Sequence, residues 1–144
     1  VSISDKMLFS SGSYNVTPRA REVLGKVAKV VNNKPDFEFM VEGHTDNVPI
    51  KNACIKDNWD LSVLRATAVV RILQDDFGVT ASRMTAAGRS EYVPVTSNAS
   101  AEGRALNRRT RIIVLPKLDQ FYNIFIFILE EESCPIGQLL LFTK

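Results

Sequence analysis

The sequence predicts an α/β (α+β) sandwich in which helices pack on one face of a mixed four-stranded sheet. Two segments carry apolar residues at the three- and four-residue spacing of an amphipathic helix, and four shorter segments have the apolar or alternating patterns of strands. Their order along the chain is β-α-β-α-β-β, which is typical of helices that cover a sheet. With 144 residues, 45% hydrophobic and 24% charged, the chain is large enough for one domain with an ordinary core.

The first half of the chain predicts a strand, a helix and a second strand. We expect a short strand over residues 1–9, followed by a polar loop. The first helix begins at Pro18, because Thr17 can cap it and proline suits the first helical position. A second strand over residues 37–42 alternates apolar and polar residues and stops at Gly43. The apolar stripe of the helix consists of Ala20, Val23, Leu24, Val27, Ala28 and Val31.

The second half predicts the longest helix and two more strands. This helix begins near Asn58 and ends before Gly78. A short third strand is expected over residues 83–87, and residues 97–105 form a polar loop with room for one helical turn. The fourth strand covers residues 110–115 and is stopped by a proline. The apolar stripe of the long helix consists of Leu61, Leu64, Ala68, Val69, Ile72 and Leu73.

The composition changes near residue 123, so we expect a domain over residues 1–122 and an apolar tail over residues 123–144. The tail has neither a helical stripe nor a clean alternation of apolar and polar residues. Two interpretations stay open. The tail is either a strand-forming appendage that pairs with another chain, as in a homodimer, or sequence that does not belong to the natural domain.

Composition and charge argue against several classes of protein. The net charge of +2 is too small to indicate nucleic-acid binding through bulk electrostatics, so we expect no nucleic acid as a partner. No apolar run reaches the roughly 20 residues of a membrane span. The chain begins at Val1 without an initiator methionine or a signal-like segment, so it is expected to be a fragment, with any targeting or membrane-anchoring segment of the parent protein upstream. The two cysteines do not indicate a redox compartment.

One pair of charges in the middle of the chain predicts a binding site for a zwitterion. Asp46 lies in the loop after the second strand and Arg65 on the second turn of the next helix, so the two can face each other across a cleft. A carboxylate accepts hydrogen bonds from an ammonium group, and a guanidinium holds a carboxylate with a two-pronged fork. Free N–H groups near Leu61 and Ser62, at the start of the helix, can add donors for the same carboxylate.

Four sequence blocks in a fixed order carry a resemblance to a known family. The first is Gly-His-Thr-Asp-Asn at residues 43–47, and the second is Asn-Trp-Asp-Leu-Ser-Val-Leu-Arg-Ala at residues 58–66. The third is Gly-Arg-Ser-Glu-Tyr-Val-Pro-Val at residues 88–95, and the fourth, at residues 98–109, ends in Asn-Arg-Arg. Together they are similar to the OmpA-like domain, the family of the OmpA, MotB and Pal domains, over residues 5–116.

The resemblance implies noncovalent binding of peptidoglycan, mainly through the diaminopimelate of its stem peptide, which would anchor an envelope protein to the cell wall. By motif position, Asp46 and Arg65 would pair with the ammonium and the carboxylate of diaminopimelate, while Asn107 and Arg108 would close the pocket or brace Asp46. The family places such a domain at the periplasmic face of the outer membrane. Residues 48–59 resemble the insert of the MotB-like branch. The other residues expected to line the pocket are Thr45, Asn47, Asn58, Leu61 and Ser62.

The chain departs from the family pattern at the end of the first strand. The family often has Phe-Asp there, with the Asp near the ligand, whereas this chain has Phe9 and Ser10. The resemblance therefore implies that Phe9 and Ser10 border the ligand without the charge contact. Ser10 can still offer its hydroxyl or its backbone.

Other interpretations compete with wall binding. His44 beside Asp46 suggests a metal site or a hydrolase of the same polymer, but the chain has one histidine and no recognisable catalytic or metal-binding set. We therefore expect no catalytic residue, no metal and no cofactor. The alternative function is a protein-interaction or oligomerisation domain of the envelope that does not bind the wall. Trp59 is expected to pack at the start of its helix, with sugar stacking as the alternative.

Overall fold

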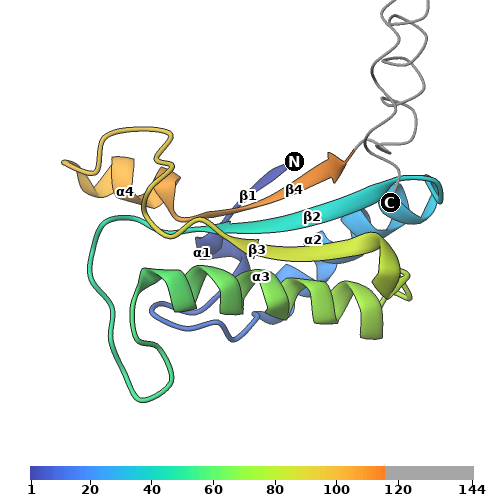
Figure 1. Ribbon diagram of the computed structural model, residues 1–144, viewed down its shortest axis with the longest axis horizontal. Coiled ribbons are helices and arrows are strands. Elements are labelled where there is room, and N and C mark those ends of the chain that lie inside the picture. The colour runs from blue at the N-terminus through green and yellow to red at the C-terminus, as the bar shows by residue number, and fades with distance from the viewer. Residues whose placement is uncertain (116–144) are drawn as a thin grey trace, which may run out of the picture.

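The computed structural model describes residues 1–115, which form one sheet with helices against it (Figure 1). Residues 116–144, which include the predicted tail at 123–144, lie outside the described residues. The elements in chain order are β1 (Ser2–Ser4), α1 (Asp5–Leu8), α2 (Pro18–Asn32), β2 (Glu38–His44), α3 (Asn58–Asp75), the 3₁₀ helix η1 (Ala81–Arg83), β3 (Met84–Gly88), α4 (Ala101–Asn107) and β4 (Arg109–Leu115).

The sheet is mixed, with the strand order β1-β4-β2-β3. β2 and β3 run parallel and are connected through α3, while β4 pairs antiparallel with both β1 and β2. α2 and α3 lie on the same face of the sheet (Figure 1). The predicted fold class, a mixed four-stranded sheet with helices on one face, is therefore confirmed.

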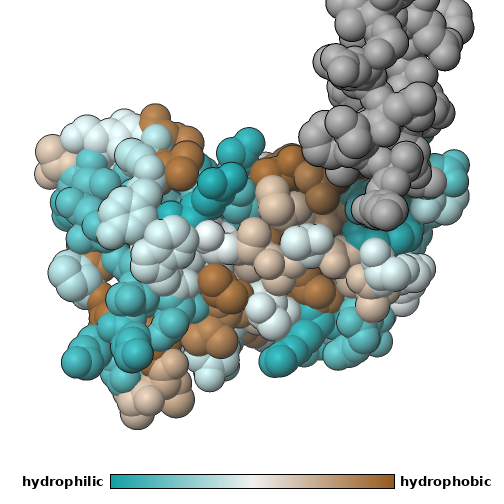
Figure 2. All heavy atoms as spheres, viewed as in Figure 1, coloured by the Kyte–Doolittle hydropathy of each residue, from teal (hydrophilic) through white to brown (hydrophobic). Residues whose placement is uncertain are grey.

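The core lies between this face of the sheet and the two long helices. Phe39 and Val41 of β2 and Ile112 of β4 are buried there against the apolar stripes of the helices, which include Leu24 of α2 and Val69 of α3. On the face seen in Figure 2, hydrophilic side chains predominate at the end of the molecule that carries α4 and the loop after β2. That end is the one at which the candidate site lies.

Two glycines allow α3 to lie directly against the ends of the parallel strands. A Cβ atom on Gly43, in β2, would meet the backbone oxygen of Ser62 at 2.2 Å, and a Cβ atom on Gly88, in β3, would meet Ser62 Oγ at 2.4 Å. Any other residue at these positions would push the helix away from the sheet. This close packing fixes the first turns of α3 beside the loops that leave β2 and β3.

The predicted strand over residues 1–9 is wrong in its second half. Only Ser2–Ser4 pair with β4, and the chain then forms one helical turn, α1. The Asp5 N–H donates to the Arg108 carbonyl at 3.1 Å, and the Phe9 N–H donates to the Asp5 carbonyl at 2.8 Å. The Asp5 side chain, at the start of this turn, is buried and has charged and polar partners in Arg65 and Thr110.

One helix, α4, is longer than predicted, whereas the long helix α3 begins at Asn58 as predicted. Residues 97–105, predicted as a polar loop with room for one helical turn, contain most of α4, which Ser100 caps by accepting a hydrogen bond from the Gly103 N–H. The helix α3 is capped by Asp57, whose side chain accepts from the Asp60 N–H, so Asn58 is the first helical residue. The side chain of Asn58 is thus free of capping and available for other contacts.

Candidate functional site

A pocket of about 750 Å³, here called the main pocket, opens where the loop after β2 meets α1, the first turns of α3, and α4. Its size is in the range of sites for small ligands. The structure brings together most of the residues that the sequence predicts for a site. Those that line the main pocket are Phe9, Ser10, Thr45, Asp46, Asn58, Leu61, Arg65 and Arg108.

Arg65 is held in the main pocket by three contacts. Its Nη1 lies 2.6 Å from Asp5 Oδ2, its Nε donates to the Ser13 carbonyl at 3.0 Å, and its guanidinium lies 5.1 Å from the centre of the Phe9 ring. Both members of the ion pair with Asp5 are buried. The guanidinium is therefore fixed in one orientation before any ligand arrives.

Asp46 has a different partner. Its Oδ2 lies 2.5 Å from Arg108 Nη1, and its Oδ1 accepts from the Val48 N–H at 3.1 Å. The Asp46 side chain is almost buried, whereas that of Arg108 is 41% exposed. Asp46 and Arg65 thus line one pocket, but within the described residues each is paired with its own counter-ion. The two ion pairs carry no net charge together.

Burial shifts the pKa values of both members of the Asp5–Arg65 pair. It raises the pKa of Asp5 from its ordinary 3.8 to about 6, although Arg65 and a hydrogen bond from Thr110 act in the opposite direction. Burial also lowers the pKa of Arg65, which is partly opposed by Asp5. The attraction between the two groups therefore does not fully compensate their loss of water. An additional anion beside Arg65 would supply part of that compensation.

Asn58 ties the loop after β2 to the loop after β3. Its Nδ2 donates to the carbonyl of Val48 at 3.1 Å, to Glu91 Oε2 at 3.0 Å, and to the carbonyl of Asp46 at 3.3 Å. The next turn of α3 places Leu61, which is buried, at the wall of the main pocket. These two side chains shape the pocket between Asp46 and Arg65.

Three predicted residues lie away from the main pocket. Asn47 lines a neighbouring pocket. Ser62 Oγ accepts from the Ser90 N–H at 3.2 Å and donates to the Trp59 carbonyl at 2.9 Å, so it fixes the turn after β3. Asn107 is buried and accepts from the Val95 N–H at 2.9 Å, so it holds the loop before α4 and does not brace Asp46.

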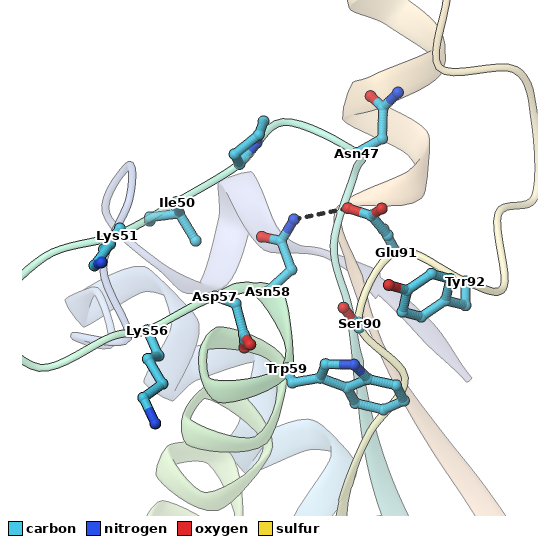
Figure 3. A pocket seen from close by; sticks show the side chains of 11 residues that line it. Asn47, Ile50, Lys51, Lys56, Asp57, Asn58, Trp59, Ser90, Glu91 and Tyr92 are labelled. Atoms are coloured by element: carbon cyan, nitrogen blue, oxygen red, sulfur yellow. Dashed lines mark hydrogen bonds between the residues drawn. The ribbon is translucent and has the colours of Figure 1, made fainter.

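The neighbouring pocket, here called the second pocket, has a volume of about 430 Å³ and is drawn in Figure 3. Trp59 and Tyr92 form part of its wall, with their ring centres 5.5 Å apart. Trp59 is 48% exposed, so the prediction that it packs at the start of its helix is wrong. The position falls in the first turn of α3, whose buried face is made by Leu61 and Ser62.

The sequence reasoning missed Asp5 and the partners of His44. Asp5 follows Ile3 by two residues, so a charge on the inward face of a predicted strand was the signal that it needs a buried partner. Glu42 is buried and accepts from His44 Nε2 at 2.7 Å and from Arg89 Nε at 2.9 Å. Burial is the largest influence on His44 and lowers its pKa.

His44 is thus placed in a buried ion-pair network. No group of three metal-binding side chains is found in residues 1–115. None of the helices formed by these residues is both long and apolar enough to cross a membrane.

Comparison with known proteins gives a consistent picture. The OmpA family matches residues 8–108 of the chain. Motility protein B of Bacillus subtilis is 35% identical over 117 residues, which are 81% of this chain and 45% of that protein. The peptidoglycan-binding protein ArfA of Mycobacterium tuberculosis is 33% identical over 106 residues, 74% of this chain and 31% of that protein. The chain spans less than half the length of these curated relatives.

A solved structure agrees with these sequence matches. The cell wall anchor of the T6SS from Pseudomonas aeruginosa is 40% identical to this chain and superposes with a TM-score of 0.73. The match covers 81% of this chain and 80% of that structure.

Proposed function

The chain belongs to the OmpA family, and on that premise we propose that it binds peptidoglycan noncovalently through the diaminopimelate of the stem peptide. Two similar proteins support wall binding by their names: one is a peptidoglycan-binding protein and the other a cell wall anchor. The arrangement that carries the finer proposal is the main pocket, in which Asp46 and Arg65 are both present and each has a separate ion-pair partner.

The charges of the main pocket suit one end of diaminopimelate. That end carries one ammonium and one carboxylate on the same carbon, so it is neutral overall, as are the two ion pairs of the pocket. The ammonium would replace Arg108 beside Asp46, since the half-exposed Arg108 side chain can move into solvent. The carboxylate would share Arg65 with Asp5. Binding would thus exchange charge partners without burying a net charge.

In this proposal the chain acts by binding and is not an enzyme. Thr45, Asn58, Leu61, Phe9 and Ser10 would shape the main pocket around the ligand. The bound domain would hold its parent protein at the wall, on the periplasmic side of the envelope, and we place that parent at the outer membrane. Attachment of the parent to a membrane through an upstream segment is part of the same proposal.

The test is calorimetric titration of the whole chain with a stem peptide that contains diaminopimelate, and with the same peptide carrying lysine. We expect saturable binding of the first and at least tenfold weaker binding of the second, because lysine lacks the carboxylate for Arg65. Asp46→Asn should weaken binding by a factor of about thirty or more, in line with the roughly 2–5 kcal/mol of a desolvated charge pair. Asp75→Asn, at the exposed far end of α3, is the matched control.

A folded chain that binds neither peptide would overturn the proposal. It would favour the alternative, a protein-interaction domain of the envelope. Equal affinity for the two peptides would show that the main pocket recognises another part of the stem peptide.

A further inference from the structure

The second pocket adjoins the main pocket. Both are lined by Pro49, Ile50 and Asn58, so the two pockets lie side by side. The residues that the second pocket does not share come from the loop after β2, the first turn of α3 and the turn after β3. Its chemistry differs from that of the main pocket, because aromatic rings take the place of the buried ion pairs.

Trp59 and Tyr92 give the second pocket an exposed aromatic wall. Their rings are tilted by 38° to each other, and 48% of Trp59 and 65% of Tyr92 are exposed to solvent. A single exposed aromatic residue is common, but two in contact at the rim of a pocket form an apolar surface with polar edges. Such a surface suits the C–H face of a pyranose ring, which is apolar while its rim is covered with hydroxyl groups.

Polar side chains lie opposite the rings. Figure 3 shows the Asn58 amide and the Glu91 carboxylate between the aromatic wall and the loop that carries Lys51, and the dashed line marks their hydrogen bond of 3.0 Å. Among the described residues, the Nδ2 of Asn58 is engaged but its Oδ1 accepts no hydrogen bond. Fixed amide and carboxylate groups beside an apolar surface are what a sugar needs for its hydroxyl and acetamido groups.

The wall of the second pocket is held by a strained residue. Ser90 has a φ of 51°, the sole positive φ of a non-glycine residue in the described part of the chain. Such a conformation persists only where neighbours enforce it. Here the Ser90 N–H donates to Ser62 Oγ at 3.2 Å, and the Ser90 carbonyl accepts from the Thr45 N–H at 2.9 Å. The turn directs the following Glu91 and Tyr92 toward Asn58 and Trp59.

From these observations we propose that the second pocket binds an N-acetylated amino sugar of the glycan strand, stacked on Trp59 and Tyr92. The sugar is the one that carries the stem peptide, so it must lie close to the peptide in the main pocket. The inference rests on the proposed binding of peptidoglycan and adds a glycan contact to it. Asn58, which lines both pockets, would then touch the ligand at the junction of sugar and peptide.

The test compares two ligands, the diaminopimelate stem peptide and the disaccharide that carries the same peptide. The wild-type chain should bind the disaccharide-peptide about tenfold more tightly. Trp59→Ala and, separately, Tyr92→Ala should remove most of that gain while leaving the affinity for the peptide alone within a factor of two. Trp59→Phe, which keeps a ring, should retain part of it. Circular dichroism checks that each variant is folded.

Trp59 is the one tryptophan of the chain, so its fluorescence gives an independent reading. In the wild type and in Tyr92→Ala, the emission should change on addition of the disaccharide-peptide and stay constant with the peptide. Equal affinity of the wild type for the two ligands, or an equal loss of both affinities in Trp59→Ala, would overturn the sugar site and leave the proposed function standing. Binding of neither ligand would overturn the proposed function and the sugar site with it.

Discussion

The guanidinium of Arg65 lies 2.6 Å from the carboxylate of Asp5, and this buried ion pair joins the first helical turn of the chain to α3. Arg65 therefore has a structural role in addition to its place in the main pocket. The two roles make different demands. The pair with Asp5 holds α1 beside α3, whereas ligand binding needs the guanidinium to bind a further carboxylate.

The first prediction concerns the pH dependence of stability. Because burial raises the pKa of Asp5 from 3.8 to about 6, the folded chain holds a proton between these pH values that the unfolded chain has released. The contribution of Asp5 to the unfolding free energy is therefore present at low pH, and it falls as the pH rises from 3.8 to about 6. The difference between the two pKa values corresponds to about 3 kcal/mol.

Asp5→Asn cannot ionise, so the difference in unfolding free energy between this variant and the wild type should shift in favour of the variant by up to about 3 kcal/mol as the pH rises from 4 to 7. Urea unfolding of both proteins at the two pH values measures this change. Other ionisable groups cancel in the comparison. A difference between the proteins that stays constant with pH would contradict the prediction.

Removal of Arg65 should destabilise the fold as well as abolish binding. The Arg65 side chain is buried, and Arg65→Ala would leave the Asp5 carboxylate without its counter-ion. Loss of one partner of a buried pair costs about 3–5 kcal/mol. Thermal or urea unfolding of Arg65→Ala measures the loss, and Arg71→Lys, exposed further along α3, is a control. Wild-type stability in Arg65→Ala would contradict the buried pair.

For binding studies Arg65→Lys is the better variant. It keeps the charge beside Asp5 and removes the planar fork that holds a carboxylate in two places. We expect a folded protein with at least tenfold weaker affinity for the diaminopimelate peptide, measured by calorimetry. Unchanged affinity would mean that Arg65 acts as a simple positive charge.

The fold could be predicted where local pattern and tertiary packing agree. The apolar stripe of α2 and the Thr17–Pro18 pair at which it begins are local signals. Both α2 and α3 end within a few residues of their predicted positions. The prediction of the first strand failed because the strand ends before the buried Asp5, and the ion-pair partner of Asp5, Arg65, lies 60 residues away. The sequence predicts only one helical turn where α4 lies, because the segment just before it is rich in Ser and Asn, which is typical of a loop, and the cap of α4 depends on a single side chain, Ser100.

The candidate site shows the same limit. The sequence placed Asp46 and Arg65 in one cleft, and both line the main pocket. It could not assign their ion-pair partners, because Asp5 and Arg108 come from opposite ends of the described chain and meet only in the folded protein. Their roles in binding stay predictions.

Gly43 offers a test of the packing that positions the pocket. Gly43→Ala would bring a Cβ atom to 2.2 Å from the backbone oxygen of Ser62, and backbone cannot move aside as a flexible side chain can. We expect a loss of about 3 kcal/mol in unfolding free energy, measured in urea. In the control Gly25→Ala the new Cβ atom would meet the Phe77 ring at 3.0 Å, so the effect should be much smaller. Equal effects would mean that α3 tolerates displacement from β2.

The last prediction concerns the buried pair of Glu42 and His44. Burial lowers the pKa of His44 below its ordinary 6.5, and the Glu42 carboxylate, 2.7 Å from Nε2, opposes this shift in part. Below pH 6.5 the unfolded chain therefore binds a proton at His44 that the folded chain does not bind. The contribution of His44 to the unfolding free energy is lost as the pH falls.

The chain has one histidine, which makes an NMR titration of its ring unambiguous. We expect a midpoint below 6.5 in the wild type and a lower one in Glu42→Gln, because that variant lacks the charge that favours the protonated ring. A midpoint above 6.5 would show that the attraction of Glu42 outweighs burial, and an unchanged midpoint in Glu42→Gln would show that the carboxylate does not act on the ring.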